Sequence, residues 1–341
     1  MMGQKKDVKL EDIAEELGVS IVSVSNALNG RKGVGAKLRE RVLQKAEELG
    51  YQSPRPNGKR EAKGYRIGVV IAERYVKEYP SFYMDVYKQV AQAVTKQGSL
   101  IVLEIVDVEK EKMEHTFQLF RNVDVQGIIL IGEMNPVFIE WMKKECQVPI
   151  VCVDFYSVGT GMDYIVTDSF RGTSALTQML IDVGHTDIGF VGTPRATNSI
   201  MDRYMGYCRS LEENGLEEKK EWLIFDREED GYGYIFDFGL PTELPTAFVC
   251  NCDKVAYQLI AKLEKKGIRV PEDISVVGFD HSYPTGSECM ELTTYESDER
   301  AMAQISVNTL MKRIEGRGKP EGVRIVEGGV VKGDSIQNRK R

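Results

Sequence analysis

The sequence predicts a small all-helical headpiece, followed by an α/β body built from two doubly wound parallel sheets. Residues 8–29 (VKLEDIAEELGVSIVSVSNALN) carry two short helical patterns of apolar residues. From residue 65 onward, short apolar runs alternate with helical segments, and the alternation occurs twice in succession. The charge is divided as well. Residues 1–60 hold 12 Lys and Arg against 8 Asp and Glu, a balance of +4 that leaves −11 for the rest, against −7 overall.

The headpiece pattern predicts a helix-turn-helix. Gly18 ends the first helix in a left-handed backbone conformation, and Ser20 is a good N-cap for the second. Two helices joined at a tight glycine turn form the motif whose second helix enters the DNA major groove. A third helix over residues 36–48 closes the core. The apolar residues expected in this core are Leu10, Ile13, Ala14, Leu17, Val24, Ala27, Leu28, Leu38, Val42, Leu43 and Ala46.

Small polar residues on the second helix favour DNA binding over a plain helical hairpin. A solvated helix face favours Glu and Lys, whereas Ser and Asn are poorer helix formers. Their side chains are good partners for phosphates and base edges. The residues expected to contact DNA on this ground are Ser20, Ser23, Ser25, Asn26 and Asn29.

The body pattern predicts parallel sheets covered on both faces, because its strands are continuously apolar. Two consecutive halves indicate two lobes, with a ligand cleft beyond the carboxyl ends of the strands. The expected strands are 65–71, 99–106, 127–131, 148–154, 188–192, 222–225, 247–250, 274–279 and 323–331. The expected helices are 82–97, 110–121, 136–145, 169–183, 199–214, 253–266 and 298–315.

Composition and motifs exclude several classes of protein. No apolar run precedes the headpiece and none reaches the length of a membrane span, so we expect a cytoplasmic protein with no membrane partner. The six cysteines have no zinc-finger or CxxC spacing; for Cys250-Asn251-Cys252, a metal or redox site remains an alternative to packing. No nucleophile-His-Asp order, paired carboxylate motif or phosphate-cradling glycine loop occurs. We therefore expect no enzyme activity, no cofactor and no metal.

A series of short motifs along the chain points to one family. In the headpiece they are Asp12-Ile13-Ala14, Gly18-Val19-Ser20, Val24-Ser25, Leu28-Asn29-Gly30, Arg39-Glu40-Arg41-Val42 and Glu48-Leu49-Gly50-Tyr51. In the body they include Val166-Thr167-Asp168, Ile188-Gly189-Phe190-Val191-Gly192, Arg203-Tyr204-Met205-Gly206-Tyr207 and residues 270–280 (VPEDISVVGFD). With these motifs the chain resembles the LacI/GalR family of bacterial transcription regulators over nearly its full length.

The resemblance implies an organisation and a function. It implies a headpiece over 1–52, a linker over 53–64, and a two-lobed effector-binding and dimerisation domain over 65–341, similar to periplasmic sugar-binding proteins. Lobe 1 would cover about 65–155 and 282–296, and lobe 2 about 156–281 and 297–335. Such a protein is a homodimeric regulator, a repressor by family, that binds operator DNA under the control of a sugar or sugar-like effector. Tyr87 and Val90 are expected at the dimer interface.

The resemblance also assigns site residues. Ile21, Val22 and Asn26 occupy the positions that read bases; the first two offer apolar contact to thymine methyl groups and Asn26 can pair with adenine. The expected effector contacts are Phe82, Tyr83, Asp154, Ser199, Arg203, Cys252, Asp253, Asp280 and Ser297. Alternatives remain open: a surface ion pair for Arg203, capping for Asp253 and Asp280, and plain core for the two aromatic residues.

Three features depart from the family. Cys252 stands where the family commonly has Asn, which puts a standard hexose arrangement in doubt. Residues 227–241 have no clear counterpart and either line an altered cleft or form a surface loop. The linker lacks the leucine wedge of a hinge helix and contains Pro56 and Gly58, so little DNA bending is expected. Two other classes of protein are alternatives for this architecture. A sugar-binding protein would need an export signal, and a sugar-modifying enzyme would need a general base beside the cleft.

Overall fold

The computed structural model describes residues 8–28, 34–49, 51, 64–77, 81–112, 123–157, 161–228, 232–235, 237–282 and 290–340. The chain divides into two compact units, Met1–Lys63 and Gly64–Arg341. Most of the predicted linker, Asn29 and most of the helix expected over 110–121 lie outside the described residues.

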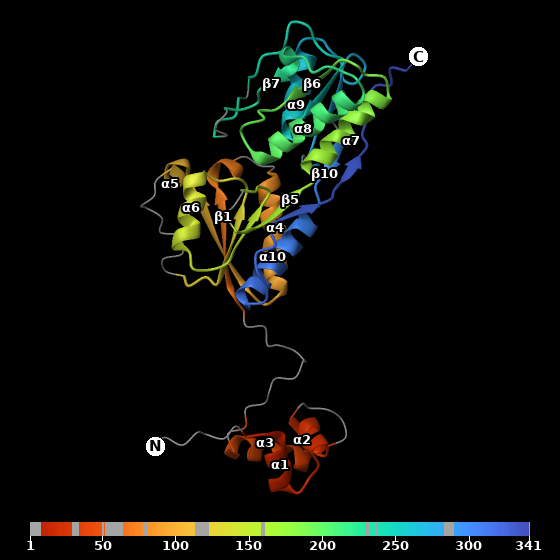
Figure 1. Ribbon diagram of the computed structural model, residues 1–341. Helices are drawn as coiled ribbons and strands as arrows, with labels where there is room; N and C mark the ends of the chain where they lie inside the picture. The colour runs from red at the N-terminus through yellow and green to blue at the C-terminus, as the bar shows by residue number, and fades with distance from the viewer. Residues whose placement is uncertain are drawn as a thin grey trace. The chain divides into compact units, whose positions relative to one another are not determined.

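The first unit is a bundle of three helices (Figure 1). They are α1 (Leu10–Leu17), α2 (Ile21–Leu28) and α3 (Ala36–Leu49). Gly18 follows α1 with a φ of 62° and donates to the carbonyls of Ala14 and Glu15, as expected of a left-handed helix end. The buried apolar residues are Ile13, Ala14, Val24, Ala27, Val42 and Ala46. The prediction for Leu43 is wrong: its side chain is 50% exposed, because the buried face of α3 follows Leu38, Val42 and Ala46 and Leu43 lies off that line.

The first lobe of the body is a six-stranded parallel sheet in the order β11-β5-β4-β3-β1-β2. Its strands are β1 (Arg66–Ala72), β2 (Leu100–Val106), β3 (Gly127–Ile131), β4 (Ile150–Val153), β5 (Asp163–Thr167) and β11 (Val323–Val326). Helices α4 (Phe82–Lys96) and α10 (Glu299–Ile314) cover one face, and α5 (Val108–Lys112) and α6 (Pro136–Glu145) lie on the other side (Figure 1). A short 3-10 turn, η1 (Glu73–Tyr75), follows β1. Val90 is fully buried in this core, so its predicted place at a dimer interface is wrong; the apolar face of α4 packs on its own sheet.

The second lobe is a four-stranded parallel sheet in the order β7-β6-β8-β9. Its strands are β6 (Ile188–Val191), β7 (Leu223–Ile224, after the turn η2, Lys220–Trp222), β8 (Ala247–Cys250) and β9 (Ser275–Val277). Helices α7 (Ser169–Asp182) and α8 (Asn198–Glu213) pack together on one face, and α9 (Asp253–Lys265) covers the other (Figure 1). An antiparallel pair, β10 (Thr294–Glu296) and β12 (Gly329–Val331), adjoins this lobe.

The predicted lobe boundaries are wrong in two places. β5 belongs to the first sheet, so the chain first crosses after Thr167 and not near Val153–Tyr156. Residues 290–296 stay with the second lobe, whereas α10 and β11 return to the first. The three crossings therefore lie at about residues 167–168, 297–298 and 327–328, and the expected crossing at 279–282 is absent from the described chain.

A glycine makes the last crossing possible. The sequence predicts one strand over residues 323–331, but the structure divides this run into β11 and β12, which belong to different sheets. Gly328 lies between them, and a Cβ there would overlap the carbonyl oxygen of Glu296 on the neighbouring crossing segment. The two segments therefore approach at backbone distance, which only glycine allows.

Candidate functional site

The two lobes enclose a polar cavity with a volume of about 80 Å³. It lies where strands end and helices begin, as expected for a doubly wound sheet. Seven of the nine predicted effector contacts line it, namely Phe82, Tyr83, Asp154, Ser199, Arg203, Cys252 and Asp280. Typical ligand sites measure about 300–1,000 Å³, so a hexose-sized molecule requires the lobes to part or side chains to move.

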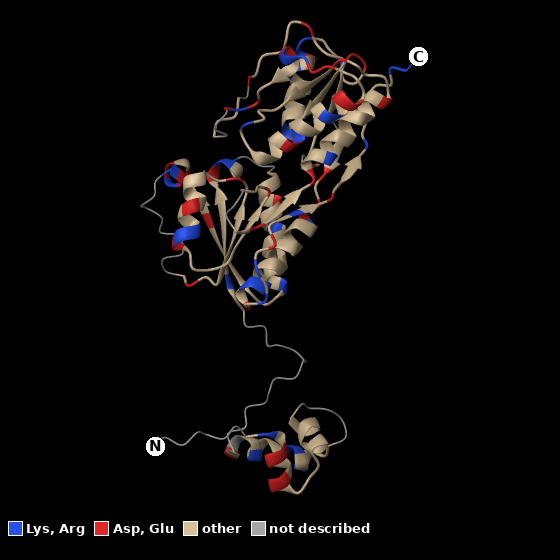
Figure 2. Cartoon of the chain, in the orientation of Figure 1, with Lys and Arg blue, Asp and Glu red and all other residues tan. Residues whose placement is uncertain are grey.

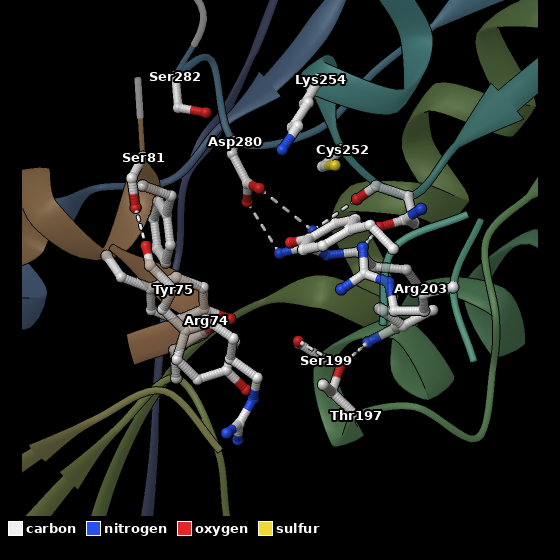
Figure 3. Close-up of a pocket in the computed structure, with 17 residues that line it drawn as sticks. Arg74, Tyr75, Ser81, Thr197, Ser199, Arg203, Cys252, Lys254, Asp280 and Ser282 are labelled. Carbon is white, nitrogen blue, oxygen red and sulfur yellow. Dashed lines mark hydrogen bonds and ion pairs between the residues drawn. The ribbon is translucent and has the colours of Figure 1, made fainter. Parts of the chain in front are cut away.

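A buried ion pair forms part of the cavity wall (Figure 3). Arg203 on α8 donates from Nη2 to Oδ1 of Asp280 over 2.8 Å, and the two side chains are only 5% and 8% exposed. Its other donors reach the carbonyl of Asn251 (2.5 Å) and Oγ of Ser169 (3.3 Å), and the guanidinium lies 3.9 Å from the centroid of the Phe279 ring. The pair is therefore not on the surface, and every nitrogen of the guanidinium has a partner.

Asp154 supplies an unused acceptor. The residue follows β4 with a φ of 65°, an uncommon conformation for a side chain other than glycine, and it is 3% exposed. Its Oδ1 atom has no hydrogen-bond partner among the described residues. Burial raises the pKa of this carboxyl to about 7, Arg203 opposes the shift and Asp280 adds to it.

Two predicted contacts lie elsewhere. Asp253 accepts hydrogen bonds from Oγ1 of Thr294 (2.6 Å) and from the backbone N–H of Ser282 (3.1 Å), so its oxygens tie α9 to neighbouring segments. Ser297 accepts from Oγ1 of Thr167 over 3.2 Å, which joins two of the lobe crossings. Asp253 is absent from the cavity wall, and it does not cap α9 either, because the N-cap of that helix is Cys252 and no capping hydrogen bond is made there.

The structure adds cavity residues that sequence reasoning missed. They are Arg74, Tyr75, Ser81, Thr197, Ile200, Arg227, Tyr234, Asn251, Lys254 and Ser282. Several of these residues are sequence neighbours of predicted cavity residues at the starts of helices. This position at a helix start is the sequence feature that could have identified them. The segment 227–241 divides: Arg227 and Tyr234 line the cavity, Phe238 packs in the second lobe, and Phe236 is outside the described residues.

Polar contacts join the two lobes around the cavity. The carboxylate of Glu133 accepts from the backbone N–H of Asn198 (2.7 Å), and the hydroxyl of Tyr156 donates to Asp202 (3.1 Å). The amide of Asn135 donates to the hydroxyl of Tyr232 over 3.0 Å. These lobe-bridging contacts connect β3, β4 and α6 of the first lobe to α8 and the 232–235 segment of the second.

The exposed side of α2 is the candidate DNA-contacting surface. Ile21 and Val22 are 46% and 68% exposed although both are apolar. Oγ of Ser20 accepts from the backbone N–H of Ser23 over 3.1 Å, which is the expected N-cap bond. Ser23, Ser25 and Asn26 are half-buried. Among the described residues of this unit, Figure 2 shows charged residues along α1 and α3 and none on α2.

The buried carboxyl groups predict a pH-dependent stability. Asp154 has a pKa of about 7 in the folded protein against about 3.9 when unfolded. The folded state therefore retains a proton that the unfolded state has lost, and the free energy of unfolding falls as pH rises from about 4 through about 7. Asp253 and Glu299, whose pKa values burial raises to about 7 and about 8, add to this slope.

Asp154→Asn is expected to stabilise the body at pH 8 by about 1–3 kcal/mol and to reduce the slope. Urea unfolding at several pH values, followed by the fluorescence of the two tryptophans, both in the body, measures this. Asp182→Asn, at an exposed carboxylate on α7, is the matched control. An unchanged slope in Asp154→Asn would show that its carboxyl stays ionised.

The fold and the two sites together define a class: a DNA-binding regulator whose body is an effector-binding domain. A model described as "Bacterial regulatory proteins, lacI family" matches residues 9–54, and one described as "Periplasmic binding protein-like domain" matches residues 177–336. The chain thus carries the two domains of a ligand-controlled transcriptional regulator, a lacI-family DNA-binding headpiece and a periplasmic-binding-protein-like body.

Known proteins resemble the chain over most of its length. It is 27% identical to the HTH-type transcriptional repressor PurR of Pasteurella multocida, over 92% of this chain and 94% of the relative. The Lac repressor dimer bound to operator and the anti-inducer ONPF shares the fold with a TM-score of 0.64 and 24% identity, covering 97% and 99% of the two chains. A complex of the regulator CelR with cellobiose has a TM-score of 0.68 at 22% identity, covering 96% and 99%.

The relatives confirm the resemblance, the fold class and the prediction that the chain is not an enzyme, because they are transcriptional repressors. In the described part of the chain, no cluster of three or more His, Cys, Asp or Glu is arranged to hold a metal ion. None of the described helices is both long and apolar enough to cross a membrane.

Proposed function

We propose that the chain binds, as a homodimer in the cytoplasm, the two half-sites of a near-palindromic operator, and that a sugar or sugar-like effector in the cavity controls this binding. The main observation behind this proposal is the buried Arg203–Asp280 ion pair at the cavity wall, together with Oδ1 of Asp154, which has no hydrogen-bond partner among the described residues. Carboxylate and guanidinium groups hold hydroxyls, and the rings of Phe82 and Tyr83 offer faces for the C–H side of a sugar.

Two fold neighbours support these partners. One neighbour is a dimer bound to operator, and another is a complex with cellobiose. In this chain, the side chains of Leu100 and Ile105 on the edge strand β2 are 66% and 43% exposed. Exposed apolar side chains at this edge are consistent with a first lobe that packs against a second copy of the chain. The exposed Ile21 and Val22 on α2 suit insertion into a major groove.

Control by the effector follows from the small volume of the cavity. A ligand that fits only when the lobes shift binds one arrangement of the lobes in preference to another, and it shifts the population toward that arrangement. In a dimer, this rearrangement changes the distance or angle between the two headpieces, and with it operator affinity.

The test identifies the operator first. A binding selection from random DNA yields the preferred sequence, and operator affinity is then measured with panels of sugars, sugar derivatives and nucleosides. A palindromic consensus and a change in affinity with a sugar-like compound support the proposal. A lack of sequence preference, or a response restricted to nucleosides, contradicts it.

Asn26→Ala is expected to weaken operator binding by about 1–3 kcal/mol and to relax the preference at one base pair in each half-site, because an amide that pairs with adenine is lost. Binding selections from random DNA, run with the wild type and with Asn26→Ala, measure the affinity and the base preference. Gln44→Ala, at an exposed position on α3, is the matched control. A weakened affinity with an unchanged consensus would assign Asn26 to a phosphate contact.

A further inference from the structure

A short hairpin of the second lobe reaches across to the first lobe beside the cavity. Its two stretches, 226–228 and 233–235, pair antiparallel at Arg227 and Tyr234, and Tyr232 directly precedes the second stretch. We propose that this hairpin is a latch: Tyr232 docks on the first lobe and holds the cavity closed, and it leaves its seat before a ligand enters. This inference rests on the proposed function, because it takes the cavity as the ligand site.

Three side chains of the first lobe form the seat of Tyr232. The amide of Asn135 donates to the hydroxyl of Tyr232 over 3.0 Å. The guanidinium carbon of Arg74 and the ammonium nitrogen of Lys112 each lie 4.6 Å from the centroid of the Tyr232 ring. A cation at this distance is attracted to the face of an aromatic ring. A hydrogen bond and two cation–π contacts therefore join Tyr232 to the other lobe.

The seat is organised within the first lobe by a buried carboxylate. Glu111, which is 0% exposed, forms an ion pair with Arg74 and accepts from the backbone N–H of Asn135 over 3.0 Å. Arg74 also donates to the carbonyl of Glu133 over 2.6 Å. Oδ1 of Asn135 caps α6, which leaves the amide nitrogen for the hairpin. These bonds all lie within the first lobe, so the seat keeps its shape when the hairpin leaves it.

The base of the hairpin is anchored in the second lobe. The backbone N–H of Thr193 donates to the carboxylate of Asp226, and Oγ1 of Thr193 donates to the carbonyl of Arg227, both over 2.8 Å. The side chain of Ile235 packs against the core of this lobe. The hairpin therefore moves with the second lobe, and parting the lobes pulls Tyr232 from its seat.

The hairpin and the seat both contribute to the cavity wall. Arg227 and Tyr234 line the cavity from the hairpin, and Arg74 lines it from the first lobe. Figure 3 shows Arg74 and Arg203, which come from different lobes, on opposite sides of the pocket. The contact between Tyr232 and Arg74 thus joins walls that belong to different lobes. Because the closed cavity is smaller than a typical ligand site, these walls separate when a hexose-sized molecule enters.

Chemical modification of Cys252 measures the opening of the cavity without any effector. This thiol lines the cavity, and burial raises its pKa to about 11, which keeps it unreactive. The full chain is treated with N-ethylmaleimide, and mass spectrometry follows modification of Cys252 and of Cys250, which is buried in β8. Modification of Cys252 alone reports an open cavity, whereas modification of both cysteines reports unfolding of the second lobe.

Tyr232→Ala is expected to speed the modification of Cys252 about tenfold or more, because its hydrogen bond and cation–π contacts to the first lobe are lost. Tyr232→Phe keeps the ring and loses the hydroxyl, so its rate should lie between those of the wild type and Tyr232→Ala. Lys112→Met removes one cation from the seat and should speed the modification too. Lys110→Met, at an exposed position on the same short helix α5, is the matched control and keeps the wild-type rate.

The latch is overturned if Cys252 in Tyr232→Ala reacts at the wild-type rate. It is also overturned if Cys252 reacts faster only together with Cys250, since Tyr232 then supports the fold of the second lobe and not its closure. Equal rates in Lys112→Met and Lys110→Met contradict the seat on the first lobe. Operator binding with sugars is a separate measurement: if the latch fails and a sugar still changes operator affinity, the proposed function stands. If the cavity opens as expected and no sugar changes operator affinity, the proposed function fails and the latch stands.

Discussion

Arg203→Ala is expected to abolish the response of operator binding to the effector while operator binding itself remains. The guanidinium is buried in the body, and the headpiece is a separate compact unit with its own core. Its removal leaves the carboxylate of Asp280 buried without its cation, which typically costs about 3–5 kcal/mol of folding free energy. DNA binding with and without effector, together with chemical unfolding of the body, measures both effects.

Arg209→Ala is the matched control for this variant. Arg209 lies on the same helix and pairs with Glu213 on the surface, where both side chains are about half exposed (50% and 52%). Such a pair contributes about 0–1 kcal/mol, so stability and effector response should change little. Equal loss of DNA binding and effector response in a folded Arg203→Ala protein would contradict the assignment.

Gly328→Ala is expected to disturb the crossing between the lobes and to lower the stability of the body by about 1–3 kcal/mol, as overpacking does. The added methyl group would overlap the carbonyl oxygen of Glu296, and backbone atoms cannot rotate away as a side chain can. Because β10 and β12 pair directly beside this contact, the effector response should weaken too. Unfolding curves and effector-dependent DNA binding measure the two effects.

The neighbouring glycine provides the control. A Cβ on Gly329 would meet nothing within 4 Å, so Gly329→Ala should behave as the wild type. If the two alanine variants are equally stable and respond equally to the effector, the close approach of the two crossing segments contributes neither to stability nor to the effector response.

The headpiece was predictable because its pattern is local. The apolar spacing within each helix, as at Val24 and Ala27 in α2 or Val42 and Ala46 in α3, fixes which face is buried, and Gly18 fixes the turn. Strand order was less predictable. β5 begins with Asp163 and is buried in the first sheet, but apolar pattern alone does not say to which sheet a strand belongs.

The cavity was predictable where residues follow family motifs, as at Arg203 and Asp280. For the unusual segment 227–241 the sequence left two alternatives, a cleft wall or a surface loop, because no local period indicates whether a loop turns inward; Arg227 and Tyr234 line the cavity. Asp253 shows the opposite case: an acidic residue in the first turn of a helix has partners of its own, and these compete with a ligand.

The lobe-bridging contacts set the scale of any allosteric response. The bonds from Asn198 and Tyr156 end on carboxylates, and a hydrogen bond to a charged group contributes about 1.5–3 kcal/mol, whereas the neutral bond from Asn135 contributes about 0.5–1.5 kcal/mol. Their sum is several kcal/mol, at or above the coupling free energies of about 1–3 kcal/mol that link two binding sites. The closed and open arrangements are thus separated by an amount that one small molecule can supply. Substitutions at this rim would therefore tune the sensitivity of the switch without altering either the DNA sequence that is read or the molecule that is sensed.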